Sequence, residues 1–142
     1  MIPVIDATDV RKEWVTIVDS VVRAKPQFFK LTRDYCFLSD FLFMEELLKG
    51  YSFTANQMME EDGSVTLALN EIDLVENGKD EKDARMKLAA SILEYSEDYY
   101  KDFTYWGSAP NRRVHIPYVF KALFIGDIQK IGENIQCQAG KI

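Results

Sequence analysis

One long amphipathic segment, residues 81–102, constrains the fold of this chain more than any other feature. It follows Asp80, a favourable N-cap residue, and its apolar side chains recur at helical spacing, which predicts a helix with one buried face. These side chains are Ala84, Leu88, Ile92, Tyr95 and Tyr99. Strand-like runs precede the helix at residues 51–59, 64–69 and 72–76. Because an apolar helix face needs a sheet to cover it, the pattern predicts a β-β-β-α unit.

The first 50 residues show a different order of elements. Residues 2–5 form a short apolar run, and a helix is predicted from Thr8 until Lys25-Pro26 ends it. Residues 27–32 and 35–38 are expected to pair as a hairpin around Arg33-Asp34, before a second helix. The predicted order is β-α-β-β-α.

Together these patterns predict an α+β protein with two domains, residues 1–50 and residues 51–142. A loop is expected at residues 107–111, followed by short C-terminal helices at residues 118–124 and 128–135. The chain has no apolar run of about 18 residues, so no transmembrane helix is expected.

Cysteine content and the N-terminal residues predict a cytoplasmic location. The N-terminus lacks the basic and apolar regions of a signal peptide, and two cysteines are too few for a disulfide scaffold. We interpret Cys36, in an alternating strand, as a buried small hydrophobe.

Catalytic and metal-binding patterns are missing from the sequence. His115 is the single histidine and immediately precedes Ile116-Pro117, which is typical of a helix start or a packed loop. The two cysteines are too far apart for zinc-ligand spacing, and no phosphate-binding glycine motif is present. We therefore expect no enzymatic activity, no catalytic residues, no metal and no cofactor.

Charge is distributed unevenly along the chain. Residues 1–50 sum to −1, residues 51–105 to −8 and residues 106–142 to +3. The acidic middle can be a solvated face, or it can attract a basic partner and raise the association rate. On the second interpretation, Glu81, Glu94 and Glu97 of the long helix are the candidate partner-binding residues.

Three cations in the first 50 residues are candidate DNA contacts. Arg11 is expected in the first turn of the first helix, where a cation opposes the helix dipole. Pairing with Asp9 or Glu13 would be the structural alternative. Lys30 and Arg33 lie on the predicted hairpin, where cations can guard a sheet edge or grip phosphates.

Apolar side chains in the same segment predict a homodimer. They supply more apolar surface than a 50-residue unit can cover alone. The candidate dimerisation residues are Val10, Trp14, Ile17, Phe28 and Phe29.

Three segments of the first 48 residues carry a family resemblance, at residues 5–14, 26–33 and 37–40. With these motifs, this part of the chain resembles the N-terminal module of the Phd/YefM antitoxins. The resemblance implies a dimer that binds operator DNA, with Arg11 and Arg33 at the positions of the family's DNA-contacting arginines. The family usually has a glycine in the hairpin where this chain has Asp34-Tyr35-Cys36.

In the second half, residues 60–67 and 77–84 and the helix through Leu93 carry another resemblance. They are similar to HicB-like antitoxins, although that family's P-G-C segment is missing. This resemblance implies a partial RNase H-like β-β-β-α core without catalytic carboxylates. Residues 106–142 contain no DNA-binding motif, so the N-terminal module would supply that activity.

The two resemblances imply the antitoxin of a type II toxin–antitoxin system. Such a protein would neutralise a small basic toxin, most plausibly a ribonuclease, and repress its own operon through operator DNA. The first alternative is a stand-alone transcription regulator with a small-ligand-sensing second domain. An enzyme is the third class, and it lacks a catalytic constellation.

Overall fold

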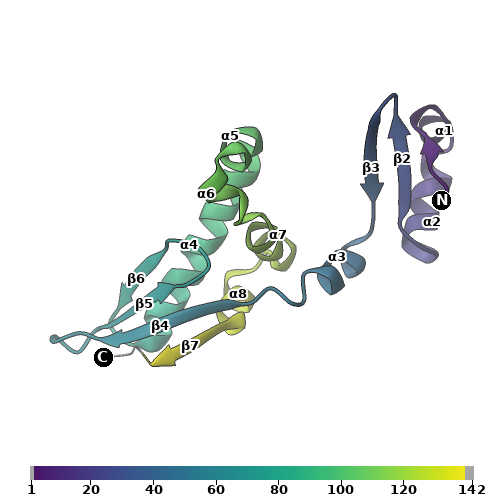
Figure 1. The fold of residues 1–142 in the computed structure, drawn as a ribbon. Coiled ribbons are helices and arrows are strands. Elements are labelled where there is room, and N and C mark those ends of the chain that lie inside the picture. The colour runs from purple at the N-terminus through teal and green to yellow at the C-terminus, as the bar shows by residue number, and fades with distance from the viewer. Residues whose placement is uncertain (1, 140–142) are drawn as a thin grey trace. The chain divides into compact units, whose positions relative to one another are not determined.

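The computed structural model describes residues 2–139 and divides the chain into two compact units (Figure 1). We call Met1–Leu47 the N-terminal unit and Leu48–Ile142 the C-terminal unit. Each contains its own sheet with accompanying helices, which makes the fold α+β.

The N-terminal unit is built on a three-stranded sheet in the order β1-β2-β3. Strand β1 pairs with β2 in parallel, whereas β2 and β3 form an antiparallel hairpin. Asp40 caps the last helix, because its Oδ1 accepts a hydrogen bond from the Phe43 backbone N–H (2.9 Å). The elements are β1 (Ile5–Asp6), α1 (Ala7–Lys12), α2 (Trp14–Arg23), β2 (Gln27–Leu31), β3 (Asp34–Leu38) and α3 (Phe41–Leu47).

Two details of this unit differ from the sequence expectation. The expected single helix breaks at Glu13 (φ −116°, ψ 32°), and the N-cap of its first half is Asp6 rather than Thr8. The hairpin turn is Thr32-Arg33 rather than Arg33-Asp34, because Leu31 pairs with Asp34. Thr32 has φ of 55° there, a conformation that costs a β-branched residue free energy.

The C-terminal unit is a four-stranded sheet in the order β6-β5-β4-β7. Its first three strands are antiparallel neighbours, and β7 joins the other side of β4 in parallel. The elements are β4 (Phe53–Met59), β5 (Val65–Leu69), β6 (Val75–Gly78), α4 (Glu81–Lys101), α5 (Phe103–Ser108), α6 (Pro110–Arg113), α7 (Ile116–Ile125), α8 (Ile128–Asn134) and β7 (Ile135–Ala139).

The β-β-β-α order agrees with the sequence prediction, but the elements around it needed correction. The third strand begins at Val75 instead of residue 72, and the expected loop at 107–111 is largely helical, in α5 and α6. Strand β7 was not predicted. It occupies the sheet edge beside β4, where Phe53 pairs with Ile135.

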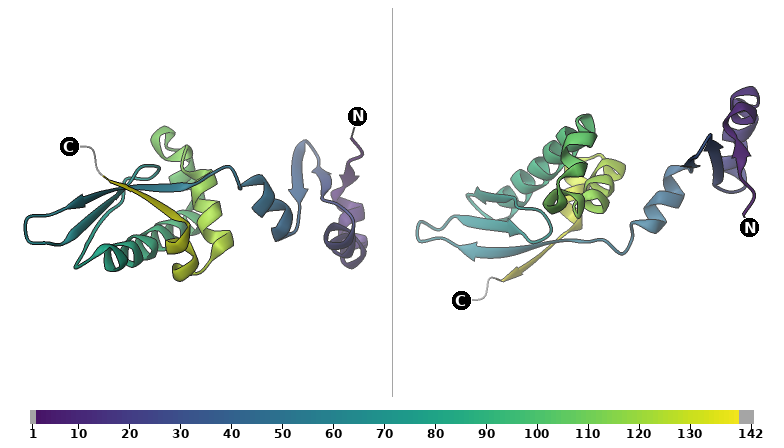
Figure 2. Two further views of the ribbon diagram at one scale, coloured as in Figure 1. Left: turned by 90° about the horizontal axis from the view of Figure 1, so that it is seen from below. Right: turned by 45° about the horizontal axis from the view of Figure 1, so that its top comes forward.

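Helices α4, α7 and α8 cover one face of this sheet (Figure 2). On the face that the helices cover, the strands present buried apolar side chains. Polar side chains lie on the other face, where the Asn77 side-chain amide donates hydrogen bonds to Ser64 Oγ and Thr66 Oγ1 (both 3.0 Å). The core is a cluster of buried apolar side chains: Phe53, Ala55, Val65, Leu67, Leu69, Ile72, Ala84, Leu88, Ala89, Ile92, Ala122, Ile131 and Ile135.

The start of α4 is fixed by a cap and by a glycine. Asp80 Oδ1 accepts a hydrogen bond from the Asp83 backbone N–H (2.8 Å), as the sequence predicted. At Gly78 an added Cβ would lie 2.3 Å from the backbone N of Ala84, so only glycine lets β6 approach the helix this closely.

Candidate functional site

Arg11 lies at the end of its helix, which corrects the sequence argument about it. Helix α1 has only six residues, and Arg11 falls in its last turn, where a cation is favourable to the helix dipole. The side chain is exposed, and among residues 2–139 no ion pair joins it to Asp9 or Glu13. The pairing alternative is therefore absent from the described structure, and so is the dipole conflict.

Lys30 and Arg33 lie on the β2–β3 hairpin. Lys30 pairs with Tyr35 across the strands, and its Nζ lies 5.4 Å from the centre of the Tyr35 ring. Arg33 is exposed at the second position of the two-residue turn. The hairpin thus presents one cation held over an aromatic ring and one that reaches into solvent.

The five candidate dimerisation residues fall into two groups. Val10 and Ile17 are buried inside the N-terminal unit, so they present little surface to a second copy. Trp14 and Phe28 are 48% and 37% exposed, and Phe29 is half-buried. Further apolar side chains of this unit are exposed although the sequence did not single them out, among them Val15, Val22, Leu31, Phe41, Leu42 and Leu47.

The acidic residues near the start of α4 are engaged in structural contacts. Glu81 Oε1 lies 2.6 Å from Arg85 Nη2, and Asp83 Oδ2 lies 3.4 Å from Lys87 Nζ. The Arg85 guanidinium continues to the backbone carbonyls of Gly132 (2.8 Å) and Ile135. Glu81 therefore helps hold α4 against the chain that leads into β7.

The other two candidates, Glu94 and Glu97, lie at the opposite end of the helix. Glu94 lies thirteen positions after Glu81, which is about 20 Å along an α-helix. The structure therefore does not bring the three predicted residues together. Glu94 and Glu97 instead share one face of the helix with Asp98, which the sequence analysis did not single out.

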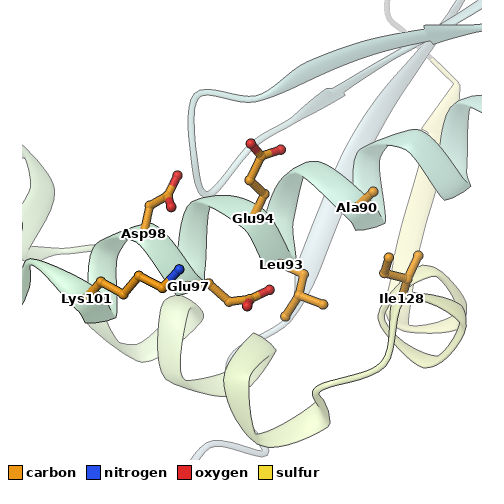
Figure 3. Close-up of a pocket in the computed structure, with 7 residues that line it drawn as sticks. All are labelled: Ala90, Leu93, Glu94, Glu97, Asp98, Lys101 and Ile128. Carbon is orange, nitrogen blue, oxygen red and sulfur yellow. The ribbon is translucent and has the colours of Figure 1, made fainter.

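This helix face forms one wall of a groove of about 290 Å³ (Figure 3). Leu93 and Ile128, from α4 and α8, supply apolar surface, and Ile128 is 38% exposed. The lining residues are Ala90, Leu93, Glu94, Glu97, Asp98, Lys101 and Ile128. Within residues 2–139, none of the three carboxylates has a hydrogen-bond or ion-pair partner.

His115 is part of a buried aromatic cluster, in agreement with its interpretation as a packed residue at a helix start. Its Nδ1 lies 2.7 Å from Tyr95 Oη, which also accepts a hydrogen bond from Arg112 Nη1 (3.3 Å). The Arg112 guanidinium lies 5.4 Å from the centre of the Trp106 ring. Burial, with a smaller effect of Arg112, lowers the pKa of His115 and favours the neutral imidazole.

Cys36 is exposed, so the expectation of a buried side chain was wrong. Cys137 lies in β7 with its Sγ 3.1 Å from Arg85 Nη2, and burial raises the pKa of its thiol. Across residues 2–139 no cluster of His, Cys, Asp and Glu side chains could hold a metal ion. No helix in that part of the chain is both long and apolar enough to cross a membrane.

Comparison with known proteins connects this geometry with a family. The PHD-like family, described as "Antitoxin of toxin-antitoxin, RelE / RelB, TA system", matches residues 1–137. The chain belongs to this antitoxin family. The antitoxin is also similar to a crystal structure from Syntrophomonas wolfei subsp. wolfei, described as the antitoxin part of a proposed toxin/antitoxin system.

That similarity extends over both units. The two chains share 33% sequence identity with a TM-score of 0.91, over 97% of the antitoxin and 99% of the other chain. No curated protein matches the antitoxin. Family membership implies a cognate toxin as partner. The assignments of the two halves to Phd/YefM and HicB-like modules stay predictions.

Proposed function

We propose that the antitoxin neutralises its toxin by direct binding through the C-terminal unit and represses its own operon through the N-terminal unit. The observation that supports this division of roles is that the two units expose different kinds of side chain. The N-terminal unit carries exposed apolar side chains beside exposed Arg11 and Arg33, whereas the strongest negative charge of the chain lies in residues 51–105.

DNA binding by this proposal uses two copies of the N-terminal unit. Trp14 and Phe28 contribute to the dimer interface, while Val10 and Ile17 support it from inside each unit. Arg11, Lys30 and Arg33 contact operator phosphates or groove edges, once in each half-site. A dimer doubles these contacts, which a unit with so few cations needs for tight binding.

Toxin binding by this proposal is electrostatically assisted. A toxin that cleaves RNA must attract phosphates and is therefore basic near its active site. The net charge of −8 over residues 51–105 would attract such a surface and raise the association rate. Neutralisation by binding requires no catalytic group of the antitoxin.

The test uses the full chain and the product of the gene next to its own, which the proposal expects to be the toxin. Expression of the adjacent gene's product alone should arrest cell growth, and co-expression of the antitoxin should restore growth. The two proteins should also purify as a complex of fixed stoichiometry. The purified antitoxin should also shift its own upstream DNA in a gel. A product that is harmless and does not bind would contradict neutralisation, and the absence of a gel shift with and without that product would contradict autoregulation.

A further inference from the structure

The carboxylates in the groove of α4 lie where helix energetics disfavour them. Asp98 is in the last turn of α4, and Glu97 immediately precedes it, so both face the negative end of the helix dipole. Glu94 and Asp98 are four residues apart, a spacing at which like charges repel by about 0.2–0.5 kcal/mol. Lys101, four residues after Glu97 and three after Asp98, is spaced to offset part of this repulsion, but within the described residues it forms no ion pair with either carboxylate. The lining therefore has three carboxylates against one ammonium group.

The first turns of the same helix show the opposite arrangement. Asp80 caps the helix, and Asp83 lies in the first turn, where the dipole favours an anion, and pairs with Lys87. Glu81 pairs with Arg85. The acidic residues of α4 thus divide into an N-terminal set with structural partners and a C-terminal set without them in the described chain.

The C-terminal set lines a groove that also offers apolar surface. Ala90, Leu93, Glu94, Glu97 and Asp98 follow one stripe of α4 at helical spacing. In Figure 3, Leu93 and Ile128 lie at one end of this stripe, and the carboxylates continue along it. Apolar surface beside an excess of carboxylates is complementary to a protein segment that has one apolar and several basic side chains.

We infer that this groove docks a basic amphipathic segment of the toxin. One apolar side chain of that segment packs between Leu93 and Ile128, and its lysines or arginines face Glu94, Glu97 and Asp98. The inference rests on the proposed function and specifies which surface of the C-terminal unit binds, and what chemistry its partner has. Charges at the groove raise the association rate, whereas the apolar contact slows dissociation.

The experiment measures association and dissociation rates between the full-length antitoxin and the purified protein encoded beside its gene, at about 50 and 300 mM salt. The groove variant is E94Q/E97Q/D98N, which removes three charges at nearly constant size. The matched control is E60Q/E61Q/E133Q, which removes three charges from exposed positions outside the groove. An Ile128→Asn variant tests the apolar contact.

The groove variant should associate on the order of tenfold more slowly at low salt, with a flatter salt dependence, while the control changes about twofold or less. Ile128→Asn should raise the dissociation rate. The groove variant should melt no lower than wild type, because the removed charges repel one another. Equal rates for the groove variant and the control would overturn the inference and leave toxin binding intact. Failure of the wild type to bind would overturn both.

Discussion

The two units differ in how completely they bury their own apolar side chains. The C-terminal unit encloses a cluster in which most members are fully inaccessible to solvent. Among residues 2–47, the buried apolar side chains are Val10, Ile17 and Val21, while larger ones such as Trp14 stay exposed. A unit of under 50 residues with so small a core is marginal by itself.

This difference suggests that the units have different requirements for a partner. The C-terminal unit encloses a core of its own, so its partner surface can be a local groove. In the proposed dimer, the N-terminal unit would gain stability when a second copy covers its exposed side chains, and its folding and dimerisation would be coupled.

The largest effect expected is on the core of the C-terminal unit. Leu88→Ala removes a side chain that is 0% exposed and should lower the free energy of unfolding of that unit by about 2–5 kcal/mol. Urea unfolding at two protein concentrations measures it. The transition of the C-terminal unit should not depend on concentration, whereas that of the N-terminal unit should. Two concentration-independent transitions would contradict the claim that only the N-terminal unit depends on a second copy for its stability.

Dimerisation should respond strongly to an exposed apolar position of α2. Val15 is 81% exposed and directly follows Trp14 of the proposed interface, so Val15→Glu would place a charge on that part of α2. Burial of such a side chain contributes about 1.5–3 kcal/mol, so the dimer should weaken at least tenfold. Sedimentation equilibrium measures the change. Thr16→Glu, at the next exposed but polar position, is the control. No weakening by Val15→Glu would place the interface elsewhere, and similar weakening by both variants would attribute the effect to added charge on α2 rather than to a lost apolar contact.

A smaller effect is expected where Arg85 holds the C-terminal strand. Arg85→Met leaves the Gly132 and Ile135 carbonyls without this donor and should cost about 1–3 kcal/mol. Amide hydrogen exchange should accelerate first in β7. The control is Lys82→Met, which also removes a cation from α4 but at an exposed position. Unchanged exchange in β7 would mean that its pairing with β4 holds it in the sheet without Arg85.

The smallest expected effect is a dependence of stability on pH. Burial lowers the folded-state pKa of His115 below its ordinary value near 6.5. Its stabilising contribution is therefore complete above pH 6.5 and is lost as pH falls through the folded-state pKa. Thermal melting between pH 7 and 5 measures this decline, which His115→Gln should flatten. An equally steep decline in that variant would assign it to other groups.

Local signals were sufficient to predict much of the fold. Asp80 and the apolar spacing after it predicted α4 within one residue at its C-terminal end. Strand β7 could not be predicted in this way. Its partner β4 lies about 80 residues earlier in the chain, and five residues carry too little alternation to distinguish a strand from the end of α8.

The candidate site was predicted only in part, and helix arithmetic explains the error. At 100° per residue, the thirteen steps from Glu81 to Glu94 leave their side chains about 140° apart around α4. The same arithmetic places Asp98 beside Glu94, so the sequence was sufficient to predict that Asp98 belongs to this helix face. The position of Arg11 in a last turn could not be predicted in the same way, because no proline or glycine marks the helix break at Glu13.

The most direct test of the account asks whether the two binding activities are separable. Fluorescence anisotropy with upstream DNA, and binding of the neighbouring-gene product, are measured for wild type, Arg11→Ala/Arg33→Ala and E94Q/E97Q/D98N. The arginine variant should lose about 1–3 kcal/mol of DNA binding for each base-reading contact, or about one unit of salt slope for each phosphate contact, and bind the toxin normally. The groove variant should do the reverse. Equal loss of both activities in either variant, or wild-type DNA binding by the arginine variant, would contradict the account.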